Sequence, residues 1–278
     1  MTKKRATVVG ATTTRLYWKC ITTSQSKDIV PHFQFFVKYF LTTQNSWEYK
    51  KESGNTMSTI LNVPQKGETD VFRSFLVKNA TYEGVEEIPK IRTSNYIPEK
   101  VISFSKAVSG KVFNRWVHFY ERDEGFERLW RTPQKYLPIL KRFQGMISPD
   151  YSLYYDMPLC MQIWNIYRGR ALAHWFQENG VEVIPNIRWG DERTFKTACL
   201  GVESGKTIAV GTHGCIKTVE GRKMFIAGFD YAINKLKPKN IIVYGRIPDK
   251  IFGLARMYSI NLLLFESEFS LSRKKGVS

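Results

Sequence analysis

The chain has 278 residues, of which 43% are hydrophobic, and a formal net charge of +17 at pH 7. A chain of this length forms one large domain or two small ones and can bury a sizeable core. It contains no run of about 18 apolar residues, and its basic start, Met1–Arg5, lacks the apolar stretch of a signal peptide. We therefore expect a cytoplasmic protein with no membrane-spanning helix.

The positive charge indicates which kind of partner the protein binds. A net charge of +17 favours polyanions such as nucleic acid or a nucleotide, although lysines spread over a surface also serve solubility alone. The four cysteines have neither the CxxC spacing nor the neighbouring histidines of a zinc site. Cys160 and Cys199 fall on apolar faces of predicted helices, so we expect buried free thiols there.

Residues 1–56 differ from the rest of the chain. They are rich in threonine and serine, more basic than acidic, and without a sustained hydrophobic period. We predict a basic, poorly structured extension, and because Met57 begins a stretch that reads like a protein start, it stays open whether this extension belongs to the natural protein. Residues 57–278 are predicted to form a single domain, in which residues 71–100 are a lead-in interrupted by Pro89 and Pro98.

Short apolar strands then alternate with helical segments along the chain. The unit around residues 143–189 reads as strand, loop, long helix, turn and strand, which is a βαβ unit with parallel strands. The predicted strands are Val101–Phe104, Arg115–Tyr120, Gln144–Ile147, Val181–Ile187, Thr207–Thr212, Asn240–Tyr244 and Asn261–Phe265. The predicted helices lie within 123–142, between the third and fourth strands, and at Arg193–Leu200, Val219–Lys237 and Pro248–Tyr258.

The predicted strands are uniformly apolar, which is typical of parallel strands buried on both faces. This predicts an α/β fold. A (β/α) barrel-like parallel sheet, closed or incomplete, fits better than a doubly wound sheet, because no glycine-rich dinucleotide fingerprint follows any strand. In either architecture a ligand binds at the carboxyl ends of the strands.

Two aspartates after neighbouring strands are the candidate catalytic groups. Asp123 and Asp150 can form a carboxylate pair for acid–base work, or hold a divalent metal as cofactor. Each has a structural alternative, since Asp123 precedes a predicted helix that it can cap and Asp150 follows Ser-Pro at a turn. The sequence leaves these alternatives open.

Other polar and aromatic residues at the predicted strand ends are candidates for substrate binding. Arg188 can hold a phosphate, and Trp189 and Tyr151 can stack on a base or a sugar ring. His213 can act as a base or a ligand, and Asp156 is either a site residue or a turn residue before Met-Pro.

Several of these segments carry a family resemblance. The blocks are VHFYERDEGFERLW from Val117, ISPDYSLYYDMP from Ile147, the helix through Arg168 and Arg170, VEVIPNIRW from Val181, and the strand ends AVGTHG and IIVYG. Together they resemble domain of unknown function 4417, a family of bacteria, phages and other mobile elements. The resemblance implies a phage or mobile-element setting and no particular activity. The family pattern has two adjacent acidic residues where this chain has Arg122 and Asp123.

These observations predict a protein associated with phages or mobile elements that acts as an enzyme on nucleic acid or a nucleotide, as a hydrolase or a transferase. The alternative is a non-catalytic nucleic-acid-binding accessory protein, and a third option is an interaction protein whose fold is only a scaffold. The sequence determines neither the reaction nor the oligomeric state.

Overall fold

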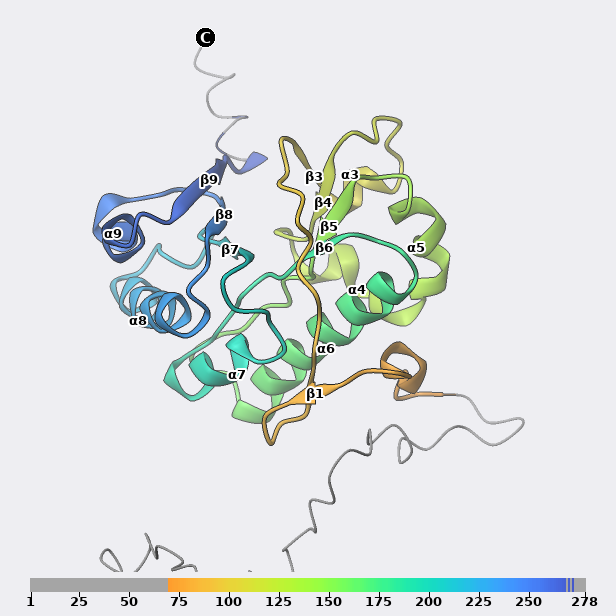
Figure 1. The fold of residues 1–278 in the computed structure, drawn as a ribbon, viewed down its shortest axis with the longest axis horizontal. Helices are drawn as coiled ribbons and strands as arrows, with labels where there is room; N and C mark the ends of the chain where they lie inside the picture. Colours follow the sequence, from red (N-terminus) through yellow and green to blue (C-terminus); the bar gives the residue numbers. More distant parts are fainter. Residues whose placement is uncertain (1–69, 269, 271, 273–278) are drawn as a thin grey trace, which may run out of the picture. The chain divides into compact units, whose positions relative to one another are not determined.

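Two parallel sheets form the centre of the protein, as seen in a computed structural model that describes residues 70–268, 270 and 272 (Figure 1). All of these residues belong to one compact unit, Thr56–Ser278. The predicted extension, 1–56, lies outside the described residues, so its boundary stays a prediction. Within the described part of the chain, no helix is both long and apolar enough to span a bilayer.

The first sheet has four parallel strands in sequence order. They are β3 (Val101–Ser103), β4 (Trp116–His118), β5 (Gly145–Ile147) and β6 (Val183–Ile184). Each strand pairs in parallel with the next, and every residue of β4, β5 and β6 is buried. The predicted strands are therefore present, but shorter than their apolar runs.

The second sheet has three longer parallel strands, also in sequence order. They are β7 (Thr207–Gly211), β8 (Asn240–Tyr244) and β9 (Asn261–Phe265). β7 is buried throughout, whereas β9 is partly exposed along its length. The prediction of strands buried on both faces is thus wrong for β9, whose free edge reaches solvent.

A short backbone connection joins the two sheets. Asn186 forms a parallel bridge with Ala209, and Ile187 N–H donates to the Ala209 carbonyl at 2.8 Å. The strands share one internal cluster, to which every strand from β3 to β9 contributes: Val101, Trp116, Ile147, Ile184, Ala209, Ile242, Leu263 and Phe265. No strand pairing joins β9 back to β3 among the described residues. The α/β class with parallel sheets is confirmed, but a closed barrel is not shown.

Helices follow the strands and cover the sheets. They are α3 (Phe104–Ala107), α4 (Asp123–Arg131), α5 (Pro133–Leu140), α6 (Leu159–Glu178), α7 (Phe195–Cys199), α8 (Val219–Leu236) and α9 (Asp249–Met257). Pro133 begins α5 at a position where proline costs no hydrogen bond. Helices α4–α6 gather around the first sheet, whereas α8 and α9 flank the second (Figure 1).

The lead-in covers a side of helix α6. The 3-10 turn η1 (Ser74–Val77) and the hairpin of β1 (Tyr82–Glu83) and β2 (Ile88–Pro89) pack against it. His174 is buried there, with its Nδ1 3.1 Å from the Leu76 carbonyl oxygen. Cys199 is buried as expected, but Cys160, in the first turn of α6, is exposed, which corrects the prediction for that thiol.

Candidate functional site

The loops after the strands gather where the parallel strands end. We call them the carboxyl-end rim; they are residues 119–122, 148–158, 186–191, 212–218 and 245–248. Because strands in a parallel sheet all run the same way, residues after different strands become neighbours there. The rim therefore brings together most of the side chains predicted as a site.

A buried polar network crosses this rim. Tyr120 donates its hydroxyl to Asn186 Oδ1 at 2.9 Å, and Asn186 Nδ2 donates to Asp150 Oδ1 at 2.7 Å. Asn186 is itself fixed, since its backbone N–H donates to Ser148 Oγ at 2.8 Å. The three side chains follow β4, β5 and β6, so the network links three neighbouring strand ends.

Arg188 extends the network to β7. Its Nη1 lies 3.8 Å from Asp150 Oδ2 and donates to Cys215 Sγ at 2.7 Å. Burial acts to lower the pKa of Arg188, but Cys215 and Asp150 outweigh it and raise that pKa. The guanidinium therefore stays charged and forms the cationic centre of the network.

Asp150 is held in an unfavourable setting for a carboxylate. Burial raises its pKa and Asp123 adds to the rise, whereas Arg188 and the Asn186 hydrogen bond oppose it. Burial likewise raises the pKa of Cys215, again against the influence of Arg188. A buried carboxylate whose pKa is raised accepts a proton more readily than an exposed one.

The packing around Gly211 leaves no room for a side chain at the centre of this network. A Cβ atom added at Gly211 would lie 2.7 Å from the Tyr120 ring and 3.7 Å from Asp150 Oδ2. Glycine at the end of β7 thus lets the tyrosine and the aspartate approach the strand. The aromatic ring of Tyr120 also stacks on Tyr244, with 4.9 Å between ring centroids.

Basic residues lie on the loops after β7 and β8, the first of which contains the network residue Cys215. Thr212 ties these loops together, since its Oγ1 accepts from Arg246 N–H at 2.8 Å. His213, Lys217 and Arg246 are exposed. The pKa of His213 is lowered by partial burial and then by the charges of Lys217 and Arg246. The three side chains therefore lie close enough to influence one another electrostatically.

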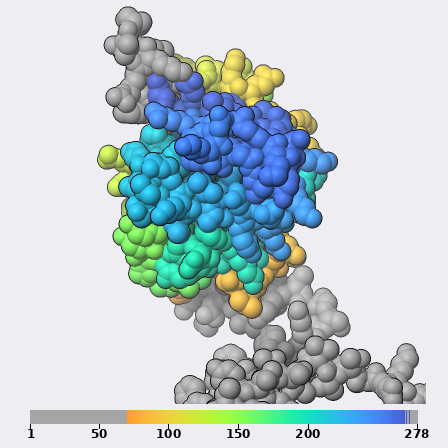
Figure 2. Space-filling model, turned by 90° about the vertical axis from the view of Figure 1, so that its left-hand side faces the viewer, coloured from red at the N-terminus to blue at the C-terminus, as the bar shows by residue number. Residues whose placement is uncertain are grey.

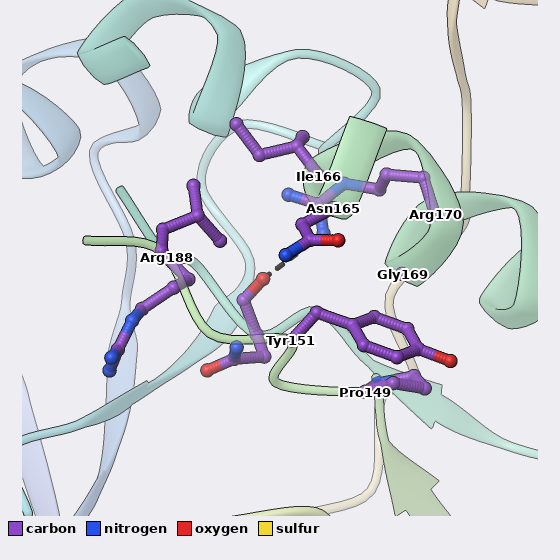
Figure 3. Close-up of a pocket in the computed structure, with 9 residues that line it drawn as sticks. Pro149, Tyr151, Asn165, Ile166, Gly169, Arg170 and Arg188 are labelled. Carbon is purple, nitrogen blue, oxygen red and sulfur yellow. Dashed lines mark hydrogen bonds between the residues drawn. The ribbon is translucent and has the colours of Figure 1, made fainter. Parts of the chain in front are cut away.

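A small cavity adjoins the network. It has a volume of about 10 Å³, which is space for about one water molecule, and it is lined by Pro149, Tyr151, Leu153, Asn165, Ile166, Gly169, Arg170, Asn186 and Arg188. In Figure 3 the Tyr151 ring and the Arg188 side chain extend in opposite directions, and Arg170 reaches in from α6. This cavity is too small for a nucleotide, so a ligand of that size has to bind on the rim outside it.

The two candidate catalytic aspartates have different partners. Asp123 is the first residue of α4, and its carboxylate accepts from Ser152 N–H at 3.1 Å and from Ser152 Oγ at 2.9 Å. It fixes the loop after β5 and influences Asp150 by charge only. In the described ranges, no group of three or more His, Cys, Asp or Glu side chains is arranged to hold a metal ion.

The two aromatic candidates are buried, which corrects the expectation of exposed stacking surfaces. Trp189 is 7% exposed, packs on Phe225 with 5.3 Å between centroids, and donates its indole N–H to the Met224 carbonyl. Tyr151 is 1% exposed, with the guanidinium of Arg168 3.9 Å from its ring centroid. Burial raises the pKa of Tyr151. Both rings therefore stabilise the core.

The remaining candidates lie at the surface. Asp156 is exposed in the turn before α6, whose N-cap position is Pro158, so it does not cap that helix. His213 is exposed beside Lys217 and Arg246, as described above. Of the seven predicted site residues, Asp150 and Arg188 are the pair that the network brings into direct contact.

Three residues of the network were not among the predicted site residues: Tyr120, Asn186 and Cys215. Tyr120 and Asn186 lie at or near the ends of predicted strands and Cys215 follows one, so position alone was the available signal. Arg170 escaped as well: its buried guanidinium donates to the carbonyls of Asn186, Ala198 and Leu200. An arginine on the apolar face of a helix was the signal that a buried, hydrogen-bonded cation was required.

The fold and the site define an α/β protein of parallel sheets with a polar network at their carboxyl ends. The family description "Domain of unknown function (DUF4417)" matches residues 80–260. This chain belongs to that family, as the resemblance indicated.

Two curated phage proteins are similar to the chain. It is 30% identical over 168 residues to the "Gene 1 protein" of Mycobacterium phage D29, covering 58% of this chain and 61% of that protein. It is 29% identical over 168 residues to the "Gene 1 protein" of Mycobacterium phage L5, covering 58% of this chain and 72% of that protein. The match thus spans about three-fifths of the D29 protein's length. No solved structure matches the chain.

Proposed function

We propose that the chain binds nucleic acid or a nucleotide on the carboxyl-end rim and acts on it through Asp150 and Arg188. The observation that carries this proposal is the cluster of His213, Lys217 and Arg246 beside the buried network, where partial burial and then the charges of Lys217 and Arg246 lower the pKa of the histidine. Cations gathered at one edge are stabilised by a polyanion, because it neutralises their mutual repulsion.

The loop between β7 and α8 supports the assignment of phosphate as the recognised group. It runs from a buried strand through GTHGCIKT into an 18-residue helix, whose N-cap Thr218 accepts from Gly221 N–H. Strand, glycine-rich loop, Lys-Thr and helix is the context of phosphate-binding loops. Ile216 stands where the full pattern has its second glycine, so we propose a related and not an identical way of binding.

Asp150 and Arg188 supply the chemistry in this proposal. Arg188 is a permanent cation that can neutralise charge developing on a phosphate oxygen. Asp150, whose pKa burial raises, can take or return a proton there. Their ion pair at 3.8 Å links the two roles. We further propose that the seven strands form an incomplete barrel, because all of them contribute to one internal cluster.

A non-catalytic binding protein is the second candidate. The network favours it, because Tyr120, Asn186, Asp150 and Arg188 satisfy one another and the adjoining cavity admits about one water. In that case the chain would be a nucleic-acid-binding accessory protein of a phage or mobile element. The binding site is common to both candidates.

Fluorescence-polarisation titration tests the proposal. Labelled single- and double-stranded DNA and RNA, and a labelled nucleotide, are titrated over a salt series with the wild type and with Lys217→Ser/Arg246→Ser. The control, Lys141→Ser/Lys239→Ser, removes the same charge from exposed positions just before β5 and β8, at the opposite ends of the strands. We expect weaker binding and a shallower salt dependence for the rim variant only.

Two outcomes separate the alternatives. Equal losses in the rim variant and its control would show that binding follows net charge, which contradicts a rim site. With binding established, product gels with magnesium or manganese compare the wild type with Asp150→Asn. Turnover lost in that variant supports the enzyme, and absence of turnover in the wild type with every bound ligand supports the accessory protein.

A further inference from the structure

Exposed aromatic side chains are concentrated on one segment that begins in the carboxyl-end rim and continues into helix α6. Tyr154 and Tyr155 are each 57% exposed on the loop after β5, and Met161 and Trp164 are 51% and 44% exposed in the first turns of α6. We call the three aromatic residues among them, Tyr154, Tyr155 and Trp164, the aromatic platform. Elsewhere in the described ranges, large exposed apolar side chains are spread among many segments. The fold does not use these side chains to fill its core.

The platform adjoins the proposed site. Its loop carries Asp150, and Arg193, just after the next rim loop (186–191), donates to the Met157 carbonyl at 3.3 Å. That loop in turn contacts α8 through the Trp189 hydrogen bond to Met224. Figure 2 shows the green surface around the start of α6 adjoining the turquoise and light-blue surface of α7 and α8. One rim loop therefore separates the platform from the cationic loop after β7.

Trp164 is held in a fixed orientation. Its ring stacks on Tyr167 with 5.6 Å between centroids and 15° between planes, and it meets Trp130 edge-on at 5.4 Å. The exposed part of the indole is thus presented by a rigid helix. An aromatic ring that is already ordered loses little conformational entropy when a flat ligand stacks on it.

We propose that the aromatic platform stacks the unpaired bases of a single-stranded nucleic acid whose phosphates lie along the cationic loops. This inference rests on the proposed function and narrows it to single strands. Tyrosine and tryptophan beside a basic surface are what single-strand-binding proteins use, because every base has a face that can stack. A duplex hides those faces in its own stack and shows only base edges. The chain's charge of +17 favours this occupant over an apolar protein partner.

Paired binding measurements test the platform. Single-stranded and duplex DNA of the same sequence are titrated with the wild type, Tyr154→Ala/Tyr155→Ala and Trp164→Leu. The control is Tyr96→Ala, which removes an aromatic side chain that is 68% exposed on another segment of the chain. We expect the platform variants to weaken single-strand binding by about tenfold and to leave duplex binding within about twofold.

If Trp164→Leu destabilises α6, the variant Tyr154→Ala/Tyr155→Ala still tests the platform. Both tyrosines lie on a loop and are largely exposed, so their replacement should leave the fold intact. Unchanged single-strand binding in the tyrosine variant, with binding lost in Lys217→Ser/Arg246→Ser, overturns the platform and leaves the proposed function intact. Absence of binding to any nucleic acid by the wild type overturns both. Sedimentation velocity measures self-association of the same variants. A platform variant that loses self-association but keeps single-strand binding also overturns the platform proposal.

Discussion

Asn186 donates a hydrogen bond of 2.7 Å to Asp150, and this bond holds the aspartate at the centre of the carboxyl-end rim. The amide accepts at the same time from Tyr120 at 2.9 Å. Asn186 is thus the residue through which the ends of β4 and β5 are joined to β6. Its neighbour Arg188 carries the charge that faces the same carboxylate.

Replacing Asn186 by Ala should destabilise the protein by about 1–3 kcal/mol. The substitution leaves a buried carboxylate oxygen and a buried phenol without their partner, and unsatisfied buried polar groups cost free energy of this size. Urea unfolding measures the difference. Asn79→Ala, at an exposed position, is the control and should change stability little. Equal stability of the two variants would contradict the network.

Asp150→Asn should behave in the opposite way. Burial raises the pKa of Asp150, so the folded state disfavours its charge at neutral pH, and a neutral amide removes that cost. We expect a free energy of unfolding at pH 7 equal to or above that of the wild type, while turnover or binding is reduced. Thermal denaturation next to a binding titration checks this. A strongly destabilised variant would show that the carboxylate serves structure instead.

Arg170→Met should cost about 3 kcal/mol or more of stability. The buried guanidinium donates to three backbone carbonyls, so its loss leaves those carbonyls unsatisfied in the core. Arg170→Lys should not restore stability, since an ammonium lacks the planar fork that reaches all three. Denaturant unfolding of both variants provides the measurement, and a lysine variant as stable as the wild type would refute this role.

Stability should fall as the pH decreases from about 6.5 to about 4, because of His118. Burial lowers its pKa from 6.5 to about 4, against the influence of Glu268 and with a further contribution from Lys106. Between those values the unfolded state binds the proton and the folded state does not, so stability is lost, by about 3 kcal/mol in all. His118→Gln should show a correspondingly smaller loss in unfolding experiments across this range. If the free energies of unfolding of variant and wild type fell equally with decreasing pH, His118 would not be the group responsible.

Gly228→Ala tests the burial of Trp189. A Cβ atom at Gly228 would lie 2.3–2.6 Å from atoms of the indole ring, so the ring or helix α8 must shift. We expect a loss of about 1–3 kcal/mol despite the higher helix propensity of alanine. Gly253→Ala in α9, where a Cβ meets nothing within 4 Å, is the matched control and should be neutral or stabilising. A stabilising Gly228→Ala would place Trp189 outside the packed core.

The sequence predicted the strands well and the loops poorly, for a physical reason. Apolar runs such as Asn240–Tyr244 mark buried strands, and parallel strands necessarily bring Asp150 and Arg188 to one rim. Beyond the end of a strand, no hydrophobic periodicity indicates where a side chain points. Trp189 and Tyr151 were therefore expected at the surface, but both are buried. Asp123 was expected beside Asp150 and instead bonds Ser152, a pairing that depends on loop geometry alone.

The most direct test of the carboxyl-end site is hydrogen–deuterium exchange with and without a bound single-stranded oligonucleotide. We expect slower exchange at residues 212–218 and 245–248, and in the loop that carries Tyr154 and Tyr155. Peptides from the opposite ends of the strands, around Lys141 and Lys239, should exchange at unchanged rates. Protection confined to those opposite ends would contradict the account, because it would place the nucleic acid away from Asp150 and Arg188.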